Sequence, residues 1–182
     1  MTTILGISGS LRKASYNTAL LRAAVELVPE GVSLESAGIH GIPLYDGDVE
    51  AAEGIPDAVA ELKERVVAAD GLLLVTPEYN NSIPGPFKNA IDWMSRPPTD
   101  SARVFGGKPV ALIGASPGRF GTISAQTAWL PVFRVLGMRP WLEMPFYLSA
   151  VHKTLDDEHR LADPDTRERL RKFLAGFAAF IG

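Results

Sequence analysis

Short apolar runs alternate along the chain with longer segments in which apolar residues recur every three or four positions. The apolar runs predict strands, and Gly71–Thr76 (GLLLVT) is so uniformly apolar that it is typical of a central parallel strand covered on both faces. The predicted strands are Thr2–Ser8, Val32–Ile39, Gly71–Thr76, Pro109–Ala115 and Arg139–Met144.

The segments with helical periodicity lie between these strands. The predicted helices are Asn17–Val28, Pro56–Ala69, Pro86–Ser95, Thr122–Leu136 and a last one that starts at Asp163-Pro164. Pro131 lacks the amide donor of a helix interior, so we expect a kink or a new segment there. The phenylalanines of the last helix follow its apolar stripe and are predicted to be core. Gly47–Gly54 is expected to be a solvent-exposed loop.

The strict alternation of strand and helix predicts a parallel sheet with right-handed crossovers and helices on both faces. A TIM barrel needs eight such units and about 250 residues, so 182 residues exclude it. Five units match the α/β flavodoxin-like doubly wound fold, a five-stranded parallel sheet with strand order 2-1-3-4-5. We expect residues 1–182 to form a single domain.

Composition narrows the classes of function. The net charge of −3 argues against a nucleic-acid partner, and the absence of cysteine excludes thiol nucleophiles, disulfides and thiolate metal sites. The three histidines are too scattered to predict a metal site. No apolar run approaches the ~20 residues of a membrane span, and no secretion signal is visible. We therefore expect a cytoplasmic protein with no membrane partner.

Ligands of open α/β sheets bind beyond the carboxyl ends of the strands, which selects three loops. The first, Ser8–Thr18, joins a strand to a helix N-terminus, where free N–H groups and the helix dipole attract anions. Its hydroxyl and amide donors accompany Arg12, whose guanidinium suits a phosphate. Neither G-x-G-x-x-G nor a Walker A sequence is present. Helix capping by Ser15 or Asn17 explains one polar residue here, but not the whole set.

The second and third loops add a different chemistry. Thr76–Pro86 contains three prolines and one glycine, so it is rigid. Tyr79 and Asn80 offer a flat surface and paired polar groups for a planar heterocycle. Gly114–Thr122 carries glycines that permit close backbone approach, together with Arg119. The alternatives are an ordinary turn and a plain strand-to-helix connection. No Ser/His/Asp or paired-carboxylate arrangement is evident, so we expect no catalytic side chain and a cofactor that carries the chemistry.

These loops resemble the NADPH-dependent FMN reductase family, which includes chromate and quinone reductases and azoreductase-like members. The resemblance runs from about Ile4 to Arg139 and rests on three segments. They read Gly9-Ser10-Leu11-Arg12-x-x-Ser15-x-Asn17, Pro77-Glu78-Tyr79-Asn80-x-Ser82-x-Pro84-Gly85 and Lys88-Asn89-Ala90-Ile91-Asp92-Trp93. The third loop, which reads Pro117-Gly118-Arg119-Phe120-Gly121, and Pro131 depart from the family pattern.

The resemblance implies non-covalent FMN, with NADPH or NADH as electron donor. It implies that the first loop holds the FMN phosphate, while the other two bracket the isoalloxazine. The implied cofactor-binding residues are Ser10, Arg12, Ser15, Tyr16, Asn17, Thr18, Pro77, Glu78, Tyr79, Asn80, Ser116, Gly118 and Arg119.

The predicted activity is an FMN-dependent NAD(P)H oxidoreductase. A hydride would pass from reduced nicotinamide to flavin N5, and then a quinone, flavin, azo or metal-oxyanion acceptor would be reduced in the same place. Arg119 is a candidate for binding the nicotinamide phosphate or an anionic acceptor. The alternatives are a flavodoxin-like electron carrier, a class that is usually far more acidic than −3, and a flavin-free phosphate-binding module.

Family members commonly form dimers or tetramers, so we expect a homodimer or homotetramer. Trp93 lies off the apolar stripe of its helix, and we interpret it as an interface residue rather than as the cap of a local surface pocket.

Overall fold

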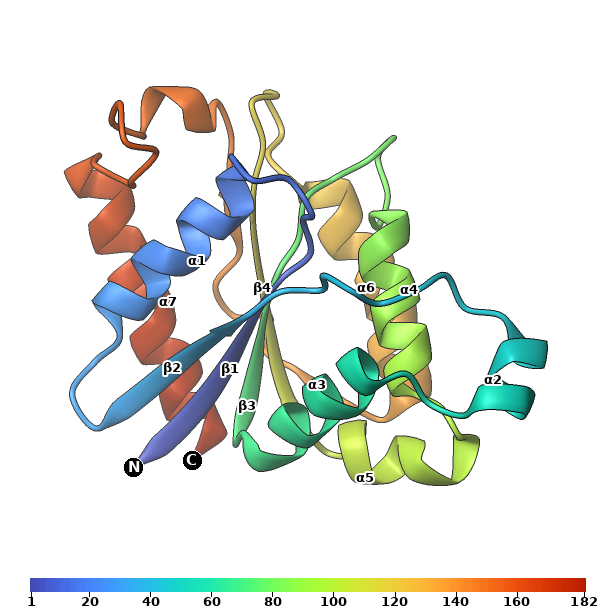
Figure 1. Ribbon diagram of the computed structural model, residues 1–182. Helices are drawn as coiled ribbons and strands as arrows, with labels where there is room; N and C mark the ends of the chain where they lie inside the picture. Colours follow the sequence, from blue (N-terminus) through green and yellow to red (C-terminus); the bar gives the residue numbers. More distant parts are fainter.

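The structure, a computed structural model, describes residues 1–182 as one sheet with helices on both faces (Figure 1). The strands are β1 (Thr2–Ser8), β2 (Val32–Ala37), β3 (Gly71–Val75), β4 (Pro109–Ala115), β5 (Arg139–Pro140) and β6 (Phe146–Leu148). The helices are α1 (Tyr16–Leu27), α2 (Gly47–Glu53), α3 (Asp57–Ala68), α4 (Gly85–Met94), α5 (Ser101–Phe105), α6 (Ile123–Leu136) and α7 (Pro164–Ile181). Short 3₁₀ turns occur at Pro98–Asp100 and Val151–Lys153.

The sheet has the order β2-β1-β3-β4-β5 with parallel pairing throughout, which confirms the predicted topology. The predicted extent of the fifth strand is wrong. Two short strands, β5 and β6, both pair with β4, and the chain leaves the ladder between them. Pro145 ends this gap, and a proline has no N–H to donate to a neighbouring strand.

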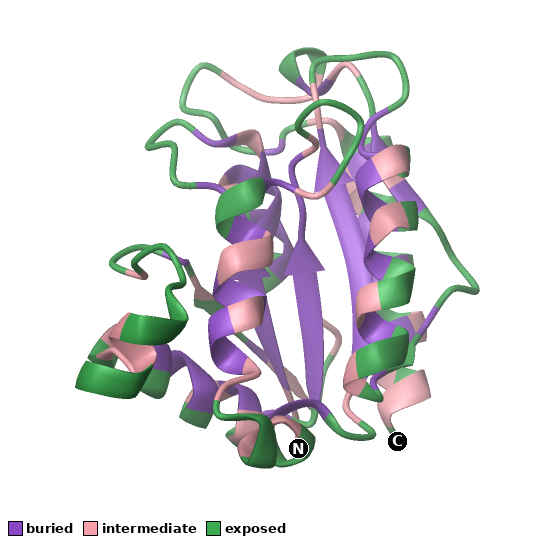
Figure 2. Ribbon diagram, turned by 90° about the vertical axis from the view of Figure 1, so that its right-hand side faces the viewer, coloured by how far each residue is buried: buried purple, intermediate pink, exposed green.

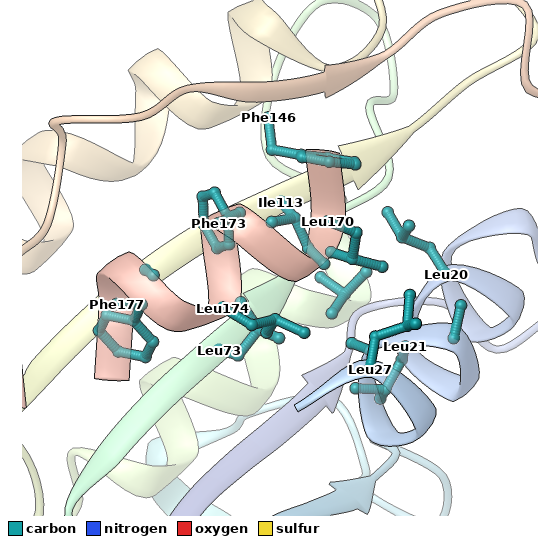
Figure 3. Packing of buried hydrophobic residues seen from close by; sticks show 14 of the residues in the cluster. Leu20, Leu21, Leu27, Leu73, Ile113, Phe146, Leu170, Phe173, Leu174 and Phe177 are labelled. Carbon is teal, nitrogen blue, oxygen red and sulfur yellow. The ribbon is translucent and has the colours of Figure 1, made fainter. Parts of the chain in front are cut away.

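Two apolar clusters hold the layers together, one on each face of the sheet. The first lies between the sheet, α1 and α7, and Figure 3 shows leucines of α1 facing Leu170, Phe173, Leu174 and Phe177 of α7. The second lies between the sheet, α3, α4 and α6. The central strands are buried on both faces, whereas the helices are buried only along their inner sides (Figure 2). The phenylalanines Phe173 and Phe177 are therefore core residues, as predicted.

Two segments differ from the prediction in a way that burial explains. Gly47–Glu53 is a helix rather than a loop, capped by Asp46, whose carboxylate accepts the N–H of Asp48 at 2.9 Å. None of its residues is buried, so no apolar periodicity marks it. Helix α6 runs continuously through Pro131, which lies on its exposed side, where the carbonyl that loses its helical partner can be hydrated.

Trp93 is not an interface residue, so that prediction is wrong. Its side chain is fully buried within the chain, and its indole N–H donates to the carbonyl oxygen of Pro43 at 2.9 Å. The ring of Tyr45 packs against it edge to face. The segment that leads into α2 therefore covers Trp93, a contact across 50 residues that helical periodicity cannot reveal.

The loops after β1, β3 and β4 gather at one edge of the sheet, opposite the two chain termini (Figure 1). This is the edge where parallel strands end and where ligands bind in open α/β sheets. No helix of the structure combines the length and the apolar character needed to cross a membrane.

Candidate functional site

The three loops enclose a hollow of about 180 Å³ at the carboxyl edge of the sheet. Residues from all three loops line it, although some lie more than a hundred positions apart in the sequence. The lining residues are Ser10, Arg12, Ser15, Tyr16, Asn17, Pro77, Glu78, Tyr79, Ala115, Ser116 and Pro117.

The first loop presents the N-terminus of α1 to this hollow. Ser15 caps the helix, because its hydroxyl accepts the N–H of Thr18 at 3.2 Å. Thr18 itself turns away from the hollow, and its hydroxyl hydrogen-bonds that of Ser8 at 2.8 Å. The loop passes so close to α4 that a Cβ at Gly9 would lie 2.0 Å from the ring of Phe87, so only glycine fits there.

Arg12 supplies the positive charge of the first loop. None of the ion pairs in the structure includes it, and its guanidinium lies 6.0 Å from the ring centre of Tyr16. Ser10 is 4% exposed and accepts the N–H of Arg12 at 3.3 Å, which leaves the proton of its hydroxyl for another acceptor. An unpaired guanidinium, hydroxyl groups and a helix N-terminus together suit a phosphate.

Asn17 connects the first loop to the third. Its side-chain amide donates to the carbonyl oxygen of Ala115 at 3.0 Å, and its oxygen accepts the N–H of Ala115 at 2.9 Å. Both bonds are buried. Asn17 therefore fixes the distance between two walls of the hollow.

The second loop contains a tight turn with the shape of a small hairpin. Tyr79 and Ser82 exchange backbone hydrogen bonds of 3.1 and 3.2 Å. Between them, Asn80 and Asn81 have φ values of 50° and 57°, the left-handed conformation that asparagine tolerates better than most residues. The turn holds the half-exposed ring of Tyr79 at the rim of the hollow, while Asn80 does not line it.

Glu78 has a contact that the sequence does not reveal. Its carboxylate accepts the N–H of Ala125, in the first turn of α6, at 2.9 Å. A carboxylate at a helix N-terminus is stabilised by the free N–H groups and the helix dipole. The side chain thus ties the second loop to α6, so we propose that Glu78 positions the platform rather than holding the flavin by its carboxylate.

One of the three residues predicted in the third loop lines the hollow. Ser116 lines the hollow and its hydroxyl accepts the N–H of Gly118 at 3.1 Å, whereas Gly118 and Arg119 do not line it. Arg119 and Phe120 are exposed beyond the rim. Ala115 and Pro117 line the hollow and were missed, because their side chains carry no polar chemistry.

The donor set fits FMN at both ends. The phosphate-binding features lie in the first loop, and the rigid turn of Tyr79 offers backbone groups and an aromatic edge to a planar ring system. We propose that Ser10, Arg12 and Ser15 hold the phosphate end and that the second loop and Ser116 border the flat end. No group of His, Asp or Glu side chains is placed to hold a metal ion.

Comparisons with known proteins identify the family of the chain. The model of the NADPH-dependent FMN reductase family matches residues 2–153. The chain is 46% identical to the NAD(P)H-dependent FMN reductase PA1204 of Pseudomonas aeruginosa, over 98% of this chain and 94% of that protein. It is 38% identical to the 2-hydroxy-1,4-benzoquinone reductase of a Burkholderia species, over 96% and 93%.

A solved structure shows the same fold. The flavoenzyme NAD(P)H:(acceptor) oxidoreductase FerB of Paracoccus denitrificans superposes with a TM-score of 0.87 and 32% identity, covering 100% of this chain and 97% of FerB. The family match spans most of the chain, and its relatives are matched over nearly their whole length. The chain belongs to the NADPH-dependent FMN reductase family.

Proposed function

We propose that the protein is an FMN-dependent NAD(P)H oxidoreductase that reduces a small acceptor, a quinone in the first instance. One observation carries the proposal: a single hollow joins the phosphate-binding first loop to the rigid turn of Tyr79, in a chain of the FMN reductase family. Relatives named quinone reductases support the acceptor class, and free flavin, azo compounds and metal oxyanions are further candidates.

The protein's own residues bind FMN and orient it. Arg12, Ser10, Ser15 and the N-terminus of α1 hold the phosphate end, and Thr18 supports the loop through Ser8. The backbone of the second loop and the ring of Tyr79 orient the flat end, with Ser116 on the opposite wall. When bound, FMN supplies the redox chemistry, the uptake of a hydride from reduced nicotinamide and its delivery as two electrons to the acceptor.

An anaerobic titration tests the proposal. The protein is reconstituted with FMN and titrated with NADPH and then NADH, while the visible flavin band is followed. We expect stoichiometric FMN uptake and rapid bleaching, with reoxidation by a benzoquinone. FMN uptake without bleaching by either nucleotide would indicate an electron carrier instead, and no FMN uptake would leave a phosphate-binding module.

We also propose that residues 1–182 act as one FMN-binding domain, in the cytoplasm, as a homodimer or homotetramer. The one sheet shared by both apolar clusters supports the single domain, and the intracellular supply of reduced nicotinamide supports the compartment. The oligomer is supported by an exposed apolar face, which we call the α6 face, around a hollow of about 210 Å³. Its exposed residues are Ile123, Leu130, Leu142 and Met144.

A further inference from the structure

A chain of two buried hydrogen bonds runs from helix α6 to the second loop. The indole N–H of Trp129 donates to the hydroxyl oxygen of Thr76 at 3.2 Å, and this hydroxyl donates to the carbonyl oxygen of Pro77 at 2.8 Å. An indole nitrogen can only donate, so the direction of the chain is fixed and the hydroxyl proton goes to Pro77. Trp129 and Thr76 have no exposed surface, so water does not compete for either bond.

The same helix holds this segment at a second point. The carboxylate of Glu78 accepts the N–H of Ala125, which lies four residues before Trp129 and therefore on the same side of α6. Trp129 itself packs against the rings of Phe87 and Phe133, whose centres lie 5.1 and 5.9 Å from its own. Two points of one helix thus fix the backbone at the start of the second loop.

The backbone of Thr76 is held as closely as its side chain. Its N–H donates to the carbonyl oxygen of Ile113 in β4 at 2.9 Å. A Cβ at Gly114 would lie 2.4 Å from the carbonyl oxygen of Thr76, so β4 can approach the loop this closely only with glycine at that position. A shift of the backbone therefore cannot easily turn the hydroxyl of Thr76 away from Pro77.

The hydrogen-bond chain sets the direction of one peptide group. The peptide between Pro77 and Glu78 is trans, so its carbonyl oxygen and its N–H point in opposite directions. The carbonyl oxygen points to the buried hydroxyl of Thr76. The N–H of Glu78 therefore points away from the interior, and it donates to no carbonyl oxygen of the chain. Because Pro77 and Glu78 both line the cofactor hollow, this N–H is a free donor for a ligand there.

We propose that Trp129 and Thr76 are positioning residues, which hold the N–H of Glu78 toward the isoalloxazine of FMN and so raise the reduction potential of the bound flavin. The inference rests on the proposed function, because it concerns the same cofactor site. A donor binds an acceptor atom more strongly when the ring gains electrons, since charge-assisted hydrogen bonds are stronger than neutral ones. Hydrogen bonds to the ring are one means by which a protein tunes such a cofactor.

Three variants of the FMN-loaded protein test the hydrogen-bond chain. Thr76→Val removes the hydroxyl and keeps the shape of the side chain, Thr76→Ser keeps the hydroxyl, and Trp129→Phe removes the N–H but keeps an aromatic ring. We expect Thr76→Val to raise the Kd of FMN about twofold to tenfold, the effect of one neutral hydrogen bond, and Thr76→Ser to bind FMN nearly as the unmodified chain does. Trp129→Phe should change the Kd in the same direction as Thr76→Val.

The reduction potential is the readout that a purely structural role would not move. It is measured against a reference dye with a chemical reductant, so no nicotinamide is needed. We expect the potential to fall in Thr76→Val and Trp129→Phe but not in Thr76→Ser. If the Kd of reduced FMN rises ten times more than that of oxidised FMN, the fall is about 30 mV for a two-electron couple.

Trp93→Phe is the matched control. Trp93 is also fully buried, and its indole N–H also donates to a carbonyl oxygen, that of Pro43, but neither residue lines the cofactor hollow. We expect this variant to lose stability without a change in the Kd of FMN or in the potential.

Three results would each overturn the proposal: an unchanged potential in both Thr76→Val and Trp129→Phe, an equal fall in Trp93→Phe, or a fall in Thr76→Ser as large as in Thr76→Val. If the protein binds FMN but neither NADPH nor NADH reduces it, the proposed function fails, and the potentials still decide the role of Thr76 and Trp129. If the unmodified chain binds no FMN, both proposals fail.

Discussion

Arg12 is the side chain on which the phosphate end of the site depends most. It carries the only charge among the first-loop residues that line the cofactor hollow, and no carboxylate neutralises it. Arg12→Ala should raise the Kd of FMN about tenfold to a hundredfold, since a charge-assisted hydrogen bond contributes about 1.5–3 kcal/mol. Quenching of flavin fluorescence during titration of the apoprotein measures this Kd.

Lys13→Ala provides the matched control for Arg12. Lys13 is the next residue in the loop, is exposed and does not line the hollow, so its removal changes the net charge equally. We expect a change in the Kd of FMN of less than about threefold, because exposed charges contribute little at ordinary salt. Equal effects of the two variants would mean that Arg12 acts only through the long-range field and not by contact.

Part of the site could be predicted from the sequence because its residues carry recognisable chemistry. The rest could not be predicted, for a physical reason. The position of the three loops follows from strand order, and the local pattern offers Ser15 and Asn17 as caps, of which the structure has Ser15. The partners of Asn17 and Glu78 do not follow, because each bond spans a long stretch of chain, 98 and 47 residues respectively. The sequence therefore predicts that both residues belong to the site, but it does not reveal that they join its walls.

Among the structural elements, the junction between α1 and β4 is held by Asn17. Asn17→Ala removes both bonds to Ala115 and leaves a buried N–H and carbonyl without partners, at a cost of about 1–3 kcal/mol each. We expect the free energy of unfolding to fall by about 2–4 kcal/mol and FMN binding to weaken, because the first and third loops can then separate. Urea unfolding of the apoprotein measures the first effect, and FMN titration measures the second.

Asn89 offers a matched control for this element. Its side chain makes the same kind of two-sided contact, to the carbonyl of Pro43 and the N–H of Tyr45, but on the exposed surface of α4. Water can replace those bonds in Asn89→Ala, so a smaller loss of stability and an unchanged Kd of FMN are expected. A loss in Asn89→Ala as large as that in Asn17→Ala would contradict the importance of burial at Ala115.

The contact between α3 and the segment before α5 predicts a dependence of stability on pH. Asp100 accepts hydrogen bonds from Arg103 and from the nearly buried Lys63, which hold the pKa of its carboxyl well below the ordinary value of 3.8. Because the folded pKa lies below the unfolded one, the carboxylate stabilises the fold above pH 3.8 and loses this effect as the pH falls further.

Asp100→Asn should therefore lower the Tm by several degrees at pH 7, with the difference from the unmodified chain shrinking below pH 4. Thermal scans at both pH values measure it. Glu168→Gln serves as the control, because its pair with Arg171 lies on the exposed face of α7, and little change is expected at either pH. A constant difference at every pH would show that Asp100 acts by shape and not by charge.

The molecule exposes an apolar surface, the α6 face, while Trp93 on the neighbouring helix is covered by the chain itself. Ile123, at the start of this face, follows the third loop directly, so a second copy seated there would border the proposed flavin site.

Leu142→Glu places a charge in the middle of the α6 face, and the desolvation of this charge on association is costly. We expect the unmodified protein to sediment as a dimer or larger and Leu142→Glu as a monomer, at micromolar concentration. Leu44→Glu alters a leucine that is more exposed than Leu142, 84% against 59%, and that lies outside this face, before α2, so this change should leave the oligomer intact. If Leu44→Glu dissociates the oligomer and Leu142→Glu does not, the interface lies beside α2 rather than on α6.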